Sequence, residues 1–166
     1  MSINIAFGFI LTMVILGFVL FFGAGVLNDL LGLSGDAGFK QQTGDIFRRV
    51  CGDENCKGGL YWMPGNSEKI TFSTSGFSEV CFLDYESDLK KSTETWEPRP
   101  NILIIDDVKE NEYNIYGIKN REATEKNIGV KTKNLKPNEN FCINKQTELI
   151  LSGKGSYVEI ALPEQV

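Results

Sequence analysis

Residues 147–162 read TELILSGKGSYVEIAL and carry the clearest structural signal in the chain. Leu149 and Leu151 lie on one side of a first strand, because alternate side chains of a strand point to the same face. Residues 152–155, Ser-Gly-Lys-Gly, tolerate the positive φ angles that tight hairpin turns require. Apolar side chains alternate again after this turn, at Val158, Ile160 and Leu162. The stretch therefore predicts a β-hairpin.

Short apolar runs bounded by Gly, Asn, Pro or Ser occur along much of the chain before this hairpin, which is typical of strands separated by turns. The predicted strands are Leu60–Met63, Lys69–Phe72, Phe77–Leu83, Ile102–Ile105, Tyr113–Ile118, Ile128–Thr132, Phe141–Asn144, Glu148–Leu151 and Tyr157–Leu162. No long periodic helix is evident after residue 50. This pattern predicts a mainly β fold, either an antiparallel β-sandwich or a barrel-like domain.

The 166 residues divide into three parts. Residues 51–166 form the β-rich soluble domain, which has enough large apolar side chains to build a core without a metal. Residues 34–50 read SGDAGFKQQTGDIFRRV, a polar stretch that predicts a spacer and a short helix. Residues 1–33 are predicted to be a transmembrane helix and its extension.

Every residue from Ile5 to Leu27 is apolar, Gly or Thr, which gives 23 positions without a charge. As a helix this run is about 34 Å long, against a hydrocarbon core of about 30 Å. The residues before it include no Lys or Arg, and the run is longer than a signal-peptide core, so cleavage at the one suitable site, Gly23-Ala24-Gly25, is the less favoured alternative. We therefore expect residues 5–27 to cross a lipid bilayer once.

Two features of the sequence point to opposite orientations of this helix. Lys40 is the one basic residue within about 20 positions after the apolar run, and it slightly favours a cytoplasmic C-terminal domain. An even number of cysteines in predicted loops and strands favours an oxidising compartment. We expect the soluble domain to lie outside the cytoplasm, at the cell membrane.

The candidate disulfide residues are Cys51, Cys56, Cys81 and Cys142. The chain has no histidine and one close cysteine pair, so the ligand pattern of a zinc site is not met. Cys51 and Cys56 enclose four residues and can close a small loop. Cys81 and Cys142 lie in predicted strands, and their bond would close a loop of about 60 residues. We favour these two pairs among the three connectivities; the alternative is that Cys81 and Cys142 are buried thiols.

The residues offer no recognisable catalytic or cofactor-binding motif. The absence of histidine removes Ser-His and Cys-His nucleophile pairs, and no Gly-rich phosphate loop is present. Alternating acids over residues 84–88 resemble the opening of a calcium loop, but Leu89 and Thr95 stand where that loop requires Gly and Glu. Asp106 and Asp107 follow a predicted strand and are interpreted as the start of a solvated turn. We therefore expect no enzyme activity, metal or cofactor.

The net charge of the chain limits the kinds of partner that it can bind. The chain has 17 basic and 22 acidic residues and a net charge of −5, which argues against an electrostatic grip on nucleic acid. The short basic runs, Arg48-Arg49 and Lys90-Lys91, have acidic neighbours and are typical of a solvated surface. We expect no nucleic-acid partner. The aromatic residues that could line a binding surface are scattered, at Tyr61, Trp62, Tyr85 and Trp96.

Two segments of the soluble part carry a resemblance when they are taken together with the apolar N-terminal run. They are EVCFLDY, residues 79–85, and FCINKQTELILSGKGSYVEI, residues 141–160. This layout resembles archaeal type IV pilin-like proteins and uncharacterised single-pass membrane-anchored envelope proteins. The basic residues that precede the helix in pilin precursors are missing here.

The resemblance implies a structural or protein-interaction role at the cell envelope, with other envelope proteins or further copies of the chain as partners. Two alternatives stay open. One is a pilin-like filament subunit assembled through the hydrophobic helix. The other is an envelope enzyme that uses a pair of carboxylates.

Overall fold

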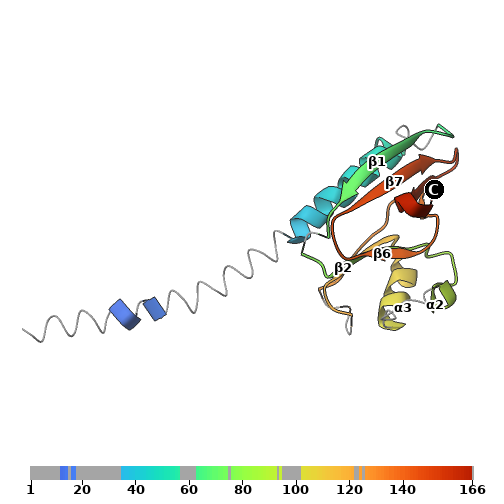
Figure 1. Ribbon diagram of the computed structural model, residues 1–166. Coiled ribbons are helices and arrows are strands. Elements are labelled where there is room, and N and C mark those ends of the chain that lie inside the picture. Colours follow the sequence, from blue (N-terminus) through green and yellow to red (C-terminus); the bar gives the residue numbers. More distant parts are fainter. Residues whose placement is uncertain are drawn as a thin grey trace, which may run out of the picture.

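The described part of the chain is mainly β. The computed structural model describes residues 12–14, 16–17, 35–56, 63–74, 76–92, 94, 102–121, 124 and 126–165. These residues form two four-stranded sheets, flanked by a helix over residues 35–51 and by the short helices α2 and α3 (Figure 1). The mainly β fold and its sandwich-like pair of sheets are therefore as predicted.

The first sheet contains the hairpin that the sequence signals most clearly. Its strands, in spatial order, are β1 (Ser67–Phe72), β7 (Thr147–Gly153), β8 (Val158–Ala161) and β5 (Leu135–Pro137). β7 and β8 are antiparallel, with Leu151 opposite Ile160. Both of these side chains are fully buried, so the alternation in the sequence marks the core face. The predicted hairpin is confirmed.

β5 departs from the expected pattern in two ways. It pairs with β8 in parallel, so the expectation of a wholly antiparallel fold is wrong at this pair. The sequence also gives no strand signal here, because Pro137 lacks the N–H that a central strand needs. β5 is an edge strand, where a missing donor is tolerated.

The second sheet is antiparallel throughout and has both faces covered. Its strands, in spatial order, are β4 (Ile128–Val130), β3 (Ile115–Ile118), β2 (Glu79–Phe82) and β6 (Phe141–Ile143). Val80 and Phe82 face the main core, and Cys81 between them faces the opposite side. All three are buried, which explains why β2 is a continuous apolar run instead of an alternating one.

The main core lies between the two sheets. The ring of Phe72 on β1 meets that of Phe82 on β2 edge-on, at 5.5 Å between centroids. Phe82 in turn stacks on Phe141 of β6 at 5.0 Å. Burial of each such side chain stabilises the fold by about 1.5–3 kcal/mol. These contacts join strands that are far apart in the sequence.

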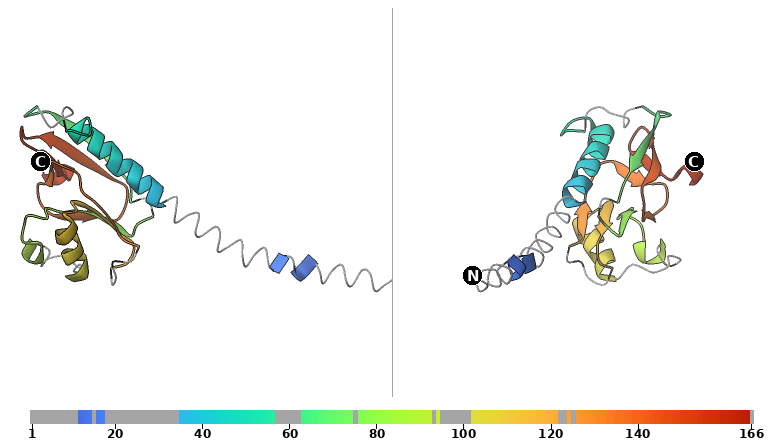
Figure 2. Two further views of the ribbon diagram at one scale, coloured as in Figure 1. Left: turned by 180° about the vertical axis from the view of Figure 1, so that it is seen from behind. Right: turned by 60° about the vertical axis from the view of Figure 1, so that its left-hand side comes forward.

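Residues 35–51 form one continuous helix beside β1 (Figures 1 and 2), instead of the predicted spacer and short helix. Phe39, Thr43, Ile46 and Val50 recur at helical spacing and are all at most 3% exposed. The Thr43 hydroxyl donates to the Phe39 carbonyl oxygen at 3.0 Å, so its burial leaves no unpaired donor. Burial of this face offsets the low helix propensity of the three glycines in the segment.

Three polar contacts attach this 35–51 helix to the sheets. Near its start, Asp36 pairs with Lys119, which follows β3. In its middle, the Gln42 side chain accepts from Ser73 N at 2.7 Å and donates to Ser73 O at 3.2 Å, just beyond β1. Near its end, Arg49 pairs with Glu68 on β1. The helix is therefore held to both sheets along its length.

A second core lies on the outer face of the second sheet, under α2 (Leu89–Ser92) and α3 (Ile102–Asn111). The prediction of a strand at Ile102–Ile105 is wrong. An apolar run of four residues fits a strand or a buried helix equally well. Ile104 and Val108 share a helical face that packs against Tyr116 and Ile118 of β3.

The other predicted strands that the structure describes are present and differ from the observed ones mainly at their ends. Those at 69–72, 77–83, 113–118, 128–132, 141–144, 148–151 and 157–162 correspond to β1, β2, β3, β4, β6, β7 and β8. The predicted strand Leu60–Met63 lies outside the described residues except for Met63, whose carbonyl oxygen accepts from Asn66 N in a turn. A 3-10 helix, η2 (Pro163–Gln165), ends the described chain.

Only part of the predicted membrane segment is described. Residues 12–14 and 16–17 are helical, and their large apolar side chains, Met13, Val14 and Leu16, are exposed. The remainder of residues 5–27 lies outside the described residues. No helix within the described ranges is both long enough and apolar enough to cross a membrane.

Candidate functional site

The Cys81–Cys142 disulfide joins the two neighbouring strands β2 and β6. The two residues are direct register partners, and their Cα atoms lie 3.9 Å apart. Cys81 is buried and Cys142 is half-buried, on the face of the sheet that α3 covers. This is one of the two pairs that the sequence favours, and the bond crosses 61 positions of the chain.

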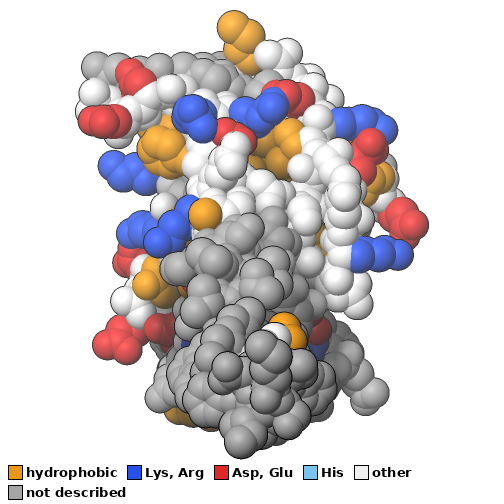
Figure 3. Space-filling model, turned by 90° about the vertical axis from the view of Figure 1, so that its left-hand side faces the viewer, with side chains coloured by type: hydrophobic (Ala, Val, Ile, Leu, Met, Phe, Trp, Pro, Cys, Tyr) orange, Lys and Arg blue, Asp and Glu red, His pale blue; other side chains and the backbone are white. Residues whose placement is uncertain are grey.

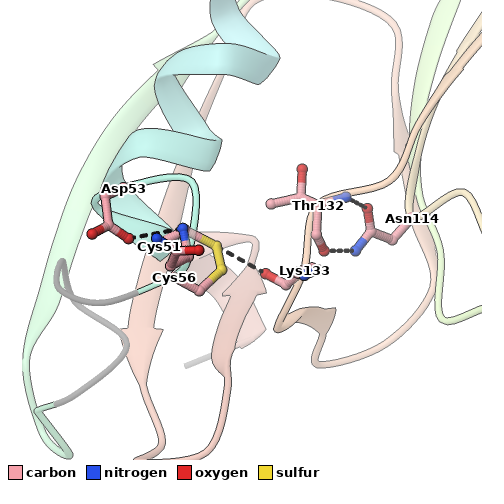
Figure 4. The surroundings of a disulfide bond; sticks show 7 residues. Cys51, Asp53, Cys56, Asn114, Thr132 and Lys133 are labelled. Carbon is pink, nitrogen blue, oxygen red and sulfur yellow. Dashed lines mark hydrogen bonds between the residues drawn. A yellow bond between two sulfur atoms is a disulfide. The ribbon is translucent and has the colours of Figure 1, made fainter.

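The Cys51–Cys56 disulfide closes the turn that follows the 35–51 helix (Figure 4). The turn is ordered by Asp53, whose backbone carbonyl oxygen accepts from Cys56 N at 3.0 Å and whose side chain accepts from Asn55 N at 3.0 Å. The Cys51 sulfur also lies 3.6 Å from the Lys133 carbonyl oxygen. All four candidate cysteines are thus in disulfides, in the favoured pairing.

Asn114 ties the second sheet to the loop that leads to β5 (Figure 4). Its buried side chain donates to Thr132 O at 2.7 Å and to Leu135 O at 2.8 Å, and it accepts from Thr132 N at 2.8 Å. The Thr132 hydroxyl is also buried, but it meets no hydrogen-bond partner among the described residues. The amide satisfies backbone groups that would otherwise be costly to bury.

A polar pocket of about 330 Å³ opens between the segment that follows β2 and the turn that joins β5 to β6. Its lining consists of Asp84, Ser87, Ser92, Pro137, Asn138, Glu139 and Asn140. Among these residues, Asp84 is the candidate that the sequence indicates. The rest lie in loops, at the end of α2 or at the end of β5, and no local pattern shows that segments about 50 positions apart in the chain meet here.

The other carboxylates singled out in the sequence do not gather at this pocket. Asp107 lies on α3, where it accepts from the Tyr116 hydroxyl at 2.5 Å. Asp106 lies beside it, within the helix instead of in a turn after a strand. Burial raises the pKa of Tyr116 well above its usual value, and the hydrogen bond to Asp107 raises it further. This hydrogen bond joins α3 to the second sheet.

The acidic residues of segment 84–88, which resembles the opening of a calcium loop, contact separate partners. Asp84 accepts from Glu86 N at 3.0 Å, which makes a local turn. The Glu86 carboxylate pairs with Lys136 on β5 at 2.5 Å, and this bond raises the pKa of Lys136. Among the aromatic candidates, Tyr85 has Lys131 6.0 Å from its ring centroid. The candidates Tyr61, Trp62, Thr95 and Trp96 lie outside the described residues.

The charged surface agrees with the interpretation of short basic runs as solvated. Arg48 pairs with Asp45 at 2.6 Å, and Lys154 pairs with Glu159 at 2.9 Å. Figure 3 shows basic and acidic side chains intermingled on the face that it presents.

No protein-family model, curated protein or solved structure matches the chain. The resemblance to archaeal type IV pilin-like proteins therefore stays a prediction.

Proposed function

We propose that this chain is a single-pass membrane protein whose β domain lies outside the cytoplasm and has a structural or protein-interaction role at the cell envelope. The observation that carries the proposal is the pairing of all four cysteines in disulfides. Disulfides of this structural kind persist in oxidising compartments and are rare in the cytosol. This consideration outweighs the slight basic bias that Lys40 gives to the opposite orientation.

The anchor in this proposal is the apolar run over residues 5–27. It comes shortly before the 35–51 helix in the chain, so the domain would stand close to the bilayer surface. Met13, Val14 and Leu16 are each about half exposed, which in water leaves a large apolar surface uncovered. Lipid would cover such side chains without further contacts.

Membrane partition tests the anchor. The full-length chain should sediment with membranes and resist extraction by alkaline carbonate. The double variant Val14→Lys/Leu16→Lys should become extractable, because each lysine costs about 2.5–3.5 kcal/mol at the centre of a spanning helix. Lys40→Ala, outside the run, is the matched control and should stay in the membrane. A wild-type chain that carbonate extracts would contradict the anchor.

The state of the thiols tests the orientation. Cells should be lysed in acid and alkylated without reductant, and the peptides then mapped by mass spectrometry. We expect Cys51 linked to Cys56 and Cys81 linked to Cys142. Four alkylated cysteines in membrane-bound protein would place the domain in a reducing compartment and end this part of the proposal.

The second candidate is a pilin-like filament subunit. It is favoured by the 35–51 helix, which lies along the sandwich and follows the apolar run in the chain. In this case the exposed Val14 and Leu16 would pack on the same segment of other copies. A photo-crosslinking residue at position 14 separates the two candidates. A ladder of self-adducts would favour the filament subunit, whereas adducts with lipid alone would favour the anchored domain.

A further inference from the structure

The two disulfides of the domain differ in how accessible they are from solvent. Cys51 and Cys56 are at most 6% exposed, and both belong to the main core between the sheets. Cys81 is also buried, on the outer face of the second sheet. Its partner Cys142 is half-buried, and it is the one cysteine of the four that is not fully buried. Because exchange depends on access to a sulfur, a thiol that approaches from solvent meets Cys142 first.

The position of Cys142 at a sheet edge also gives an incoming chain a place to align. Cys142 is the middle residue of β6, which forms one end of the second sheet and pairs with β2. An edge strand offers backbone N–H and C=O groups on its outer side, to which an extended segment of another protein can add. Residues directly opposite on neighbouring strands have Cβ atoms about 4.5–5.5 Å apart. A cysteine opposite Cys142 on this outer side would therefore face the sulfur from the side away from Cys81.

One acidic side chain lies next to this disulfide. Glu79 is two residues before Cys81 on β2 and hence on the same face, and its carboxylate lies within 4.8 Å of both sulfurs. Glu79 also pairs with Arg121. A negative charge at this distance opposes both an incoming thiolate and the charge that develops on the leaving sulfur. The Glu79 carboxylate is therefore expected to slow the opening of the bond.

We propose that the Cys81–Cys142 bond is an exchange site for a protein dithiol, that attack begins at Cys142, and that Glu79 limits the rate. The first thiolate of the partner bonds to the Cys142 sulfur, and the Cys81 sulfur leaves with the electron pair and takes up a proton. The second thiol of the partner then attacks the mixed disulfide and releases Cys142 as a thiol. The partner is oxidised to a disulfide, and the domain gains two electrons and two protons.

Opening the bond changes how the edge of the second sheet is held. β6 is three residues long and pairs with β2 at three positions, one of which is the disulfide pair itself. Phe141 and Ile143 are buried in the main core, and they hold β6 when the bond is open. The disulfide is thus a redox-sensitive lock on this edge strand. This inference goes beyond the envelope role and does not depend on the membrane anchor or its orientation.

The order in which the bonds open is the first test. The full-length chain in detergent is treated with dithiothreitol, samples are quenched with excess N-ethylmaleimide at intervals, and the alkylated cysteines are located by mass spectrometry. We expect Cys81 and Cys142 to be alkylated at least about tenfold faster than Cys51 and Cys56, because of the difference in access. A thioredoxin that retains only its attacking cysteine should be trapped in a mixed disulfide with Cys142.

A matched pair of variants tests the charge. Glu79→Gln should open the Cys81–Cys142 bond about three- to fivefold faster, because it removes the negative charge and keeps the positive charge of Arg121 nearby. Glu148→Gln removes the same charge from an ion pair with Lys69 on the first sheet, and it should leave the rate unchanged.

The rate for the Cys51–Cys56 bond is the internal control in every variant, because a general loosening of the fold would raise it as well. The proposal is overturned if this bond opens as fast as the other in the wild type, or if the trapped thioredoxin is on a cysteine other than Cys142. It is also overturned if Glu79→Gln opens the Cys81–Cys142 bond no faster than the wild type does.

Discussion

The two disulfides close loops of very different length, and this difference predicts how much each contributes to stability. The Cys81–Cys142 bond spans 61 positions, and the Cys51–Cys56 bond spans 5. In the chain-entropy description, cross-linking removes freedom from the unfolded chain, and the effect grows with the logarithm of loop length. This gives about 4 kcal/mol for the long loop and about 2 kcal/mol for the short one.

The perturbation is a pair of double variants, Cys81→Ala/Cys142→Ala and Cys51→Ala/Cys56→Ala. The same side-chain atoms are removed in each, and three of the four cysteines are almost fully buried, so the packing losses are similar. The free energy of unfolding should therefore fall by about 2 kcal/mol more for the first variant than for the second.

The assay is guanidinium denaturation of the full-length chain in detergent, followed by circular dichroism, with linear extrapolation to water. Each curve is fitted with its own slope, because loss of a cross-link lets the unfolded chain expand and expose more surface. The reasoning is refuted if loss of the Cys51–Cys56 bond costs as much as loss of the other. In that case the contacts of the local turn, and not the length of the closed loop, would decide how much each disulfide contributes to stability.

Four further substitutions test individual positions in the domain. A Cβ on Gly129 would overlap the ring of Tyr113, so Gly129→Ala should destabilise the fold by about 1–3 kcal/mol; Gly44→Ala, with open space around it, should instead stabilise it slightly in the same denaturation assay. Thr132→Val should raise the free energy of unfolding by about 1 kcal/mol, because it removes a buried hydroxyl without a partner, and a lower denaturation midpoint would contradict this account. The pKa of Tyr116 is raised in the folded state, so the folded state holds this proton more tightly than the unfolded state does. The resulting contribution to the free energy of unfolding is complete below the ordinary tyrosine pKa of about 10 and is lost as the pH rises above it. Wild-type stability should therefore fall more steeply than that of Tyr116→Phe between about pH 10 and 12, and parallel curves would show that this residue is not responsible.

The sequence predicts most of the strands because their apolar residues follow local patterns. In residues 147–162 the alternation and the turn residues agree, and the structure has the hairpin with Leu151 opposite Ile160. The sequence favours the observed pairing of the cysteines because two of them are close in the chain and two lie in predicted strands. Each of these inferences depends on neighbours within a few positions.

Elements decided by distant contacts are less predictable. The run Ile102–Ile105 carries no periodicity of its own, and it is helical because its buried face meets Tyr116 of β3. β5 exists because β8 offers it a partner, although Pro137 weakens its local signal. The pocket depends on Asn140, which lies 56 positions from Asp84. Nothing near Asn140 in the sequence distinguishes it from any other turn residue.

The three attachments of the 35–51 helix have a mechanical consequence. A pull along the helix axis from residue 35 would load the contacts of Asp36, Gln42 and Arg49, which follow one another along the helix. Because these side chains are attached to both sheets, a force along the helix is shared as shear among the three contacts instead of breaking one after another. The domain is therefore arranged to resist being pulled from its N-terminal side.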